Sequence, residues 1–149
     1  MQAVFHWLRI ETFVYATEKE DLVRETFSGL IGTEEYDTEI SEGEHGNRML
    51  ILQRMATKQK EMEKVFSNLG NELLAQLLED VDNRIDDDCV FYTRLDKQKA
   101  VCGTYSAAHH GDVISITGKV ASNPAKKEVA VRNFTAFVSS LLSQTRPPE

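Results

Sequence analysis

Apolar and polar residues alternate over residues 4–16, and this period of two predicts a long first β-strand. Over residues 17–31 the apolar residues recur every three or four positions, which is typical of an amphipathic helix. Thr17 and Glu20 have the spacing of a capping box at the start of this helix. The same two periods predict the remaining elements, which are strands over 35–42, 48–56, 89–95, 99–105 and 113–121 and helices over 62–69, 73–85 and from 124 onward.

The predicted elements follow in the order β-α-β-β-α-α-β-β-β-α. Short turns join most neighbouring strands, and the helices do not alternate with the strands one for one. This order predicts an α+β fold with a mostly antiparallel sheet and helices packed on one face. The other face of such a sheet is free for solvent or for a partner. No repeat or linker divides the chain, so we expect a single domain over 1–149, ordered over about 4–144 with a frayed tail at 145–149.

Composition restricts the class of protein. With 149 residues, of which 41% are hydrophobic and 28% charged, the chain is long enough for one ordinary hydrophobic core. No apolar run is long enough to cross a bilayer, and the N-terminus lacks the pattern of a signal peptide, so we predict a cytoplasmic protein without a membrane partner. Cys89 and Cys102 have no metal-ligand spacing, and no glycine-rich phosphate loop is present, so we predict neither a metal nor a cofactor.

The net charge of −7 is unevenly distributed. Residues 1–50 carry 4 basic and 11 acidic side chains, whereas residues 91–149 carry 8 basic and 4 acidic ones. A basic last third on an acidic protein is what a local anion-binding surface would produce, although so small a set of charges also arises by chance.

Two lysines lie where the last helix is predicted to begin. Asn123 is the predicted N-cap, Pro124 takes the first helical position, and Lys126 and Lys127 follow. The helix dipole disfavours cations at this end, unless the lysines help the helix to bind an anion such as phosphate. The alternative is that both side chains simply extend into water.

Five short stretches occur in a recognisable order. They are His45-Gly46-Asn47, Arg84-Ile85-Asp86-Asp87, Asp96-Lys97-Gln98, Gly111-Asp112-Val113-Ile114 and Pro124-Ala125-Lys126-Lys127-Glu128. With these stretches in this order, the chain resembles a family of small archaeal proteins described as predicted RNA-binding proteins or exosome subunits. The resemblance covers about residues 4–142. The resemblance implies RNA binding and a fold similar to the large-subunit ribosomal protein that binds 5S rRNA. Met49 stands where the family pattern has a proline and Asn123 where it has an aromatic residue, which puts base stacking at that position in doubt.

We therefore predict a non-catalytic RNA-binding protein, associated with an RNA-processing assembly such as the exosome or with a ribosome-related one. The basic and polar side chains of the C-terminal third would contact the RNA phosphates, and the turn near residue 46 supplies secondary candidates. The predicted RNA-binding residues are Lys97, Gln98, Lys99, Lys119, Asn123, Lys126 and Lys127, and the secondary candidates are His45, Asn47 and Arg48.

Three alternatives stay open on the sequence alone. In the first, the acidic N-terminal half docks on a basic protein partner and the chain does not touch RNA. In the second, a sheet edge pairs two copies into a homodimer. In the third, Asp86, Asp87 and Asp88 hold Mg²⁺ for phosphodiester cleavage, but an acidic run after a helix is usually a hydrated turn.

Overall fold

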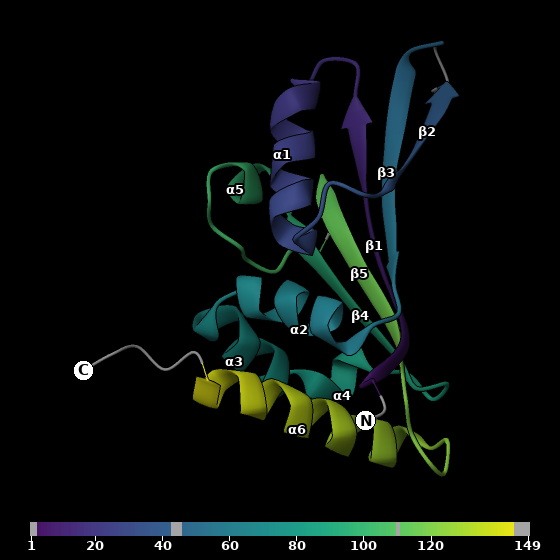
Figure 1. Cartoon of the computed structure of the whole chain (residues 1–149), viewed down its shortest axis with the longest axis vertical. Coiled ribbons are helices and arrows are strands. Elements are labelled where there is room, and N and C mark those ends of the chain that lie inside the picture. The colour runs from purple at the N-terminus through teal and green to yellow at the C-terminus, as the bar shows by residue number, and fades with distance from the viewer. Residues whose placement is uncertain (1–2, 43–45, 110, 145–149) are drawn as a thin grey trace, which may run out of the picture.

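The computed structural model describes residues 3–42, 46–109 and 111–144 of the chain. It consists of two layers, an antiparallel sheet and a layer of helices against one face of that sheet (Figure 1). The strands are β1 (Phe5–Tyr15), β2 (Asp37–Glu42), β3 (Arg48–Ala56), β4 (Val90–Asp96) and β5 (Val113–Val120). The helices are α1 (Glu20–Ile31), α2 (Gln59–Asn68), α3 (Asn71–Glu79), α4 (Val81–Arg84), α5 (Lys97–Val101) and α6 (Lys127–Gln144). The predicted α+β class with a one-sided helical layer is confirmed.

The strands are ordered β2-β3-β1-β5-β4, and every neighbouring pair is antiparallel. The long strand β1 lies at the centre and pairs with both β3 and β5. The buried face of β1 is the one that carries Leu8, Ile10, Thr12 and Val14, which pack against the helices, while the residues that alternate with them face away. None of the described helices has both the length and the apolar character needed to cross a bilayer.

Five phenylalanine rings form the centre of the hydrophobic core. Neighbouring rings in this cluster have centroids 4.6–6.2 Å apart. The cluster ties β1 and β4 to α2 and α6, since its members are Phe5, Phe66, Phe91, Phe134 and Phe137.

Gly118 on β5 has no side chain, and the ring of Phe5 from this cluster occupies the space that a side chain would fill. A Cβ atom at Gly118 would lie 2.7 Å from Cδ1 of Phe5 and 2.9 Å from Cδ1 of Leu8, both closer than side-chain carbons pack. We expect Gly118→Val to lower the free energy of unfolding by about 2 kcal/mol through overpacking, as measured by urea denaturation. Thr117→Val, on the other face of the same strand, is the control. A Gly118→Val protein as stable as the wild type would show that the rings move aside without cost.

The predicted strand over 99–105 is wrong. Asp96 instead caps the short helix α5, its side chain accepting a hydrogen bond from the backbone N–H of Lys99 (2.9 Å). The edge of β4 is then paired by a later segment, through a bridge between Leu95 and Ala107 and a hydrogen bond from the Ala108 N–H to the Arg94 carbonyl. The apolar pattern alone did not distinguish this capped turn from a strand.

Two predicted helix starts are also wrong, and the long predicted helix over 73–85 is divided at Asp80 into α3 and α4. The first helix begins at Glu20 after Lys19, so Thr17 does not cap it. The last helix begins at Lys127, and Pro124 lies in the preceding loop. There the N–H groups of Val129 and Ala130 bond to the carbonyl of Lys126, which places this lysine at the N-cap.

Candidate nucleic-acid interface

The face of the sheet that the helices leave uncovered carries aligned polar side chains. Tyr92 of β4, Thr117 of β5 and Arg9 of β1 form one row across the strands. Arg94, Ser115 and Glu11 form the next row in the same order. Since side chains two residues apart on a strand share a face, both rows lie on this open face.

The open face is hollowed beside β4. The hollow has a volume of about 590 Å³, and we call it the arginine hollow. Its floor is formed by the two rows just described, and its wall by the α3–α4 segment and the loop that pairs with the edge of β4. The residues that line it are Arg9, Glu11, Asp80, Asn83, Arg84, Tyr92, Thr93, Arg94, Ala108, His109, Ser115 and Thr117.

Arg84 is held in the wall of the hollow by a chain of hydrogen bonds. Its Nε lies 3.1 Å from Oδ2 of Asp80, and its Nη1 donates to Oγ1 of Thr93 at 2.9 Å. The amide of Asn83 donates to the other Asp80 oxygen at 2.8 Å. This bond, together with the charge of Arg84, holds the pKa of Asp80 below its usual range. Asp80 therefore stays ionised near neutral pH and keeps the guanidinium in place.

The guanidinium groups of Arg9 and Arg94 have fewer partners than that of Arg84. Arg94 is exposed and donates through Nη1 to the carbonyl of His109 at 3.0 Å. Within residues 3–42, 46–109 and 111–144, no ion pair or side-chain hydrogen bond of Arg9 is found. Against Glu11 and Asp80, the three arginines leave one net positive charge in a hollow on a protein of net charge −7. Their remaining N–H donors are available to an anion.

Tyr92 places an aromatic ring on the floor of the hollow, with half of its surface exposed (50%). Loss of hydration raises the pKa of its phenol, and the nearby carboxylates of Asp86 and Asp88 raise it further. The ring thus stays neutral at physiological pH and does not repel an anionic ligand.

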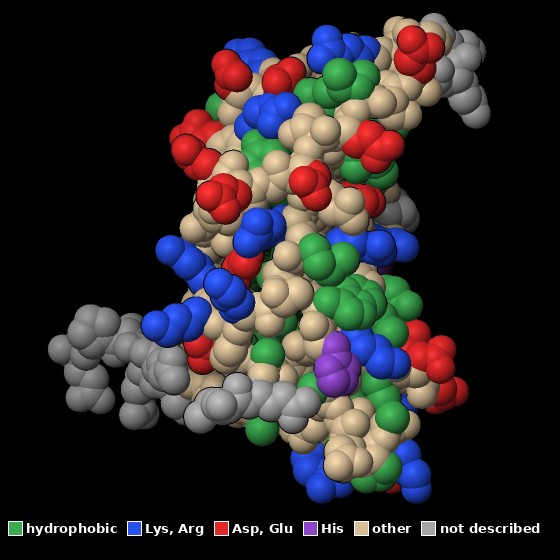
Figure 2. All heavy atoms as spheres, turned by 45° about the vertical axis from the view of Figure 1, so that its right-hand side comes forward, with side chains coloured by type: hydrophobic (Ala, Val, Ile, Leu, Met, Phe, Trp, Pro, Cys, Tyr) green, Lys and Arg blue, Asp and Glu red, His purple; other side chains and the backbone are tan. Residues whose placement is uncertain are grey.

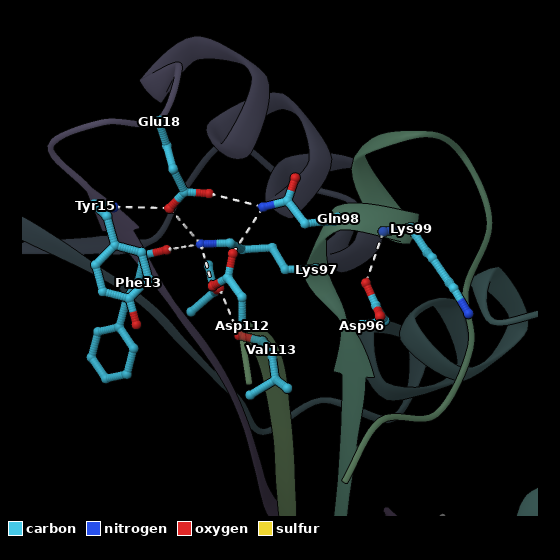
Figure 3. Close-up of polar contacts among 10 residues, drawn as sticks. Phe13, Tyr15, Glu18, Asp96, Lys97, Gln98, Lys99, Asp112 and Val113 are labelled. Carbon is cyan, nitrogen blue, oxygen red and sulfur yellow. Dashed lines mark hydrogen bonds and ion pairs between the residues drawn. The ribbon is translucent and has the colours of Figure 1, made fainter. Parts of the chain in front are cut away.

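Lys97 was predicted to contact phosphate, and the structure shows instead that it is a structural residue. Its side chain is fully buried (0% exposed), and its ammonium lies 4.9 Å from the centre of the Tyr15 ring. The Nζ donates to the carbonyl of Phe13 at 2.6 Å and to Oε1 of Glu18 at 2.7 Å, and it lies 2.8 Å from Oδ1 of Asp112 (Figure 3). The three N–H donors of the ammonium are matched by three oxygens, so none is left for RNA.

The two residues after Lys97 lie away from the open face as well. The Gln98 amide donates to Oδ2 of Asp112 at 2.8 Å and to Oε2 of Glu18 at 3.3 Å, completing the same network (Figure 3). Lys99 is exposed, but α5 belongs to the helical layer, on the other side of the sheet from the hollow (Figure 1). Lys97, Gln98 and Lys99 therefore do not share a surface with the polar face of the last strand.

Of the remaining predicted residues, Lys119 lies at the end of β5, and Asn123, Lys126 and Lys127 lie in the loop that follows and at the start of α6. Lys119 is on the open face beside Trp7, and its ammonium donates to the carbonyl of Asp88. Lys127 donates to the carbonyl of Asp82 at 2.8 Å. Asn123 and Lys126 are exposed in the loop before α6. Of the secondary candidates, Asn47 and Arg48 are exposed at the far end of the sheet, and His45 is outside the described residues.

The acidic run near residue 87 forms a turn. Oδ1 of Asp86 accepts the backbone N–H groups of Asp88 (2.9 Å) and Val90 (3.0 Å), which fixes the entry into β4. Across the described part of the chain, no three carboxylate, imidazole or thiol groups are arranged to hold a metal ion.

Comparison with known proteins places the chain in a family. A family model described as RNA binding matches residues 7–120. The chain belongs to this RNA-binding family. Among its relatives, an RNA-binding protein of Pyrococcus abyssi is 32% identical over 137 residues, covering 85% of this chain and 89% of the relative. An uncharacterised protein of Methanocaldococcus jannaschii is 28% identical over 142 residues, covering 87% and 94%.

A solved structure shares the fold of this member of the RNA-binding family. It is a DUF54 protein of Methanothermobacter thermautotrophicus, with a TM-score of 0.77 and 30% identity over 90% of this chain and 98% of that one. The resemblance to an archaeal RNA-binding family is confirmed by these matches.

Proposed function

We propose that this protein binds RNA without catalysing a reaction on it, and that the RNA backbone lies on the open face along the arginine hollow. One observation carries the proposal: three arginines line one hollow, with Arg9 and Arg94 on the uncovered face of the sheet and Arg84 on α4 beside the edge strand β4. Membership of the RNA-binding family supports it.

The distribution of charge over the protein supports this placement of the RNA backbone. Acidic side chains gather in the upper half of the view in Figure 2, which in Figure 1 holds α1, β2 and the adjoining ends of β1 and β3. Phosphates are repelled from that end of the molecule and attracted to the basic groups at the other. On the same face of β5, Ser115 lies beside Arg94 and Thr117 beside Arg9, and Lys119 continues this line of polar side chains toward the loop that carries Lys126.

The groups of the hollow support a binding role over a catalytic one. Asp80 has a lowered pKa and is occupied by Asn83 and Arg84, which makes it a weak proton acceptor. Glu11 faces Ser115 in the register, without a second free carboxylate beside it among the lining residues. The two carboxylates of the hollow are therefore not paired as a general acid and a general base.

The test is a fluorescence-anisotropy titration of labelled RNA at two salt concentrations. We expect the affinity of the wild type to fall as salt rises, and Arg94→Glu to weaken binding about tenfold at the lower salt. Lys60→Glu, an equal charge change at an exposed position of the helical layer, is the matched control and should bind like the wild type. Absence of binding to any RNA at low salt would overturn the proposal.

A second candidate function is docking on a basic protein, within an RNA-processing or ribosome-related assembly. The acidic end shown in Figure 2 favours it, and its free edge strand β2 carries Asp37, Glu39 and Glu42. The same edge is where a second copy of the chain would add. A partner bound there should be lost on Asp37→Lys with Glu39→Lys, variants that leave the arginine hollow intact.

A further inference from the structure

The shape of the arginine hollow indicates more than contact with a phosphate backbone. Its volume of about 590 Å³ falls in the range of small-molecule sites, about 300–1,000 Å³. The wall formed by Arg84 and Asp80 stands beside the edge strand β4, so the hollow is bounded on that side. A flat basic surface would suffice for a duplex backbone, whereas a bounded hollow suits a single unit of a ligand.

Tyr92 is the group on its floor that suits a nucleobase. The cross-strand partner of Tyr92 is Thr117, whose short side chain does not cover the ring. Among the described residues, no ring–ring contact involves Tyr92, in contrast with the five packed phenylalanines of the core. Exposed aromatic rings on open sheets bind unpaired bases by stacking, which does not require a particular base.

Two guanidinium groups, those of Arg84 and Arg94, line the hollow together with Tyr92. Arg84 comes from α4 and is fixed by Asp80 and Thr93. Arg94 comes from β4, two residues from Tyr92 on the same face, and is fixed by the carbonyl of His109. Both groups are held in place before any ligand arrives, which lowers the entropic cost of binding one.

Resting on the proposed function, we infer that the arginine hollow binds one unpaired nucleotide, with its base stacked on Tyr92 and its phosphate held by Arg84 and Arg94. The RNA recognised at this point is therefore single-stranded. A base inside a duplex is paired and stacked on its neighbours, so its flat face is not available to the ring.

The experiment compares Tyr92→Ala and Tyr92→Phe with the wild type on two RNAs, an unstructured oligoadenylate of about 10 nucleotides and a blunt RNA duplex. We expect the wild type to prefer the oligoadenylate. Tyr92→Ala should bind it about tenfold more weakly, with an unchanged salt dependence, because stacking releases no counterions. Tyr92→Phe, which keeps the ring, should bind like the wild type. Neither substitution should change binding to the duplex.

The outcomes separate this inference from the proposed function. Equal or tighter binding to the duplex, or wild-type binding of the oligoadenylate by Tyr92→Ala, would overturn the stacked-nucleotide site. If Arg94→Glu still weakened binding in that case, RNA binding on the open face would stand. Failure of the wild type to bind either RNA would overturn both. Unfolding curves of the two Tyr92 variants check that neither substitution acts through the fold.

Discussion

Replacing Lys97 with methionine is expected to lower the free energy of unfolding by about 3–5 kcal/mol. The ammonium is fully buried and neutralises Glu18 and Asp112, whose side chains are only 15% and 29% exposed. Methionine fills a similar volume but removes the ammonium from both carboxylates and from the Phe13 carbonyl. Removing one charge from a buried network destabilises the fold by more than the intact network stabilises it, because the remaining charges stay buried without a counter-charge. Denaturant unfolding of the two proteins measures the difference.

Two controls separate this cause from a general loss of charge. Lys99→Met makes the same substitution two residues along, at an exposed position of the same helix, and should change stability by less than about 0.5 kcal/mol. Adding Glu18→Gln and Asp112→Asn to the Lys97→Met protein removes the uncompensated charges and should restore part of the stability. A Lys97→Met protein within about 1 kcal/mol of the wild type would show that water enters and solvates the site.

The contacts of Lys97 show what two of the stretches that carry the family resemblance do in the structure. Asp96-Lys97-Gln98 contains two of the predicted RNA-binding residues, whereas Gly111-Asp112-Val113-Ile114 contributes to the family resemblance alone. In the structure, Lys97 and Gln98 meet Asp112 and Glu18, and join α5 to the turn before α1 and to the start of β5 (Figure 3). Both stretches therefore stabilise the fold, and our proposal assigns phosphate binding to other residues.

The spacing of apolar residues along the chain made much of this fold predictable. Alternation in the first and last strands identified both elements, because Leu8, Ile10 and Val14 share one phase of β1, as Ile114, Ile116 and Val120 share one phase of β5. The capped turn of α5 was missed because its short apolar run also suits a strand. The burial of Lys97 was missed for a different reason. Lysine is almost never buried, and the carboxylates that compensate it lie 79 and 15 positions away in sequence.

The candidate site was predicted in outline and not in its residues. The open face, its hydroxyls and Lys119 follow from the alternation in the last strand. The same alternation places Arg9 and Arg94 on that face, a signal present in the sequence and not used. Arg84 gave no such signal, because its place in the wall depends on the packing of α4 beside β4.

The largest functional effect is expected from reversing two of the three arginines together. Arg9→Glu with Arg94→Glu should weaken RNA binding by more than about hundredfold at low salt, since each change removes a cation and adds a repelling anion. The loss of two phosphate contacts should also make the salt dependence shallower, by about 1.4 in the slope of log affinity against log salt for a single strand. Anisotropy titrations at several salt concentrations give both quantities.

The matched control for this variant is Lys58→Glu with Lys60→Glu, an equal change in total charge at two exposed positions at the start of α2. If long-range repulsion by the whole acidic protein governed binding, both double variants would weaken RNA binding by the same factor. Their salt slopes would then also be equal. If the arginine hollow holds the backbone, only the first variant loses affinity and slope together. Equal losses would therefore reject the hollow as the RNA site, whereas a loss confined to Arg9 and Arg94 places the phosphates against guanidinium groups on the open face.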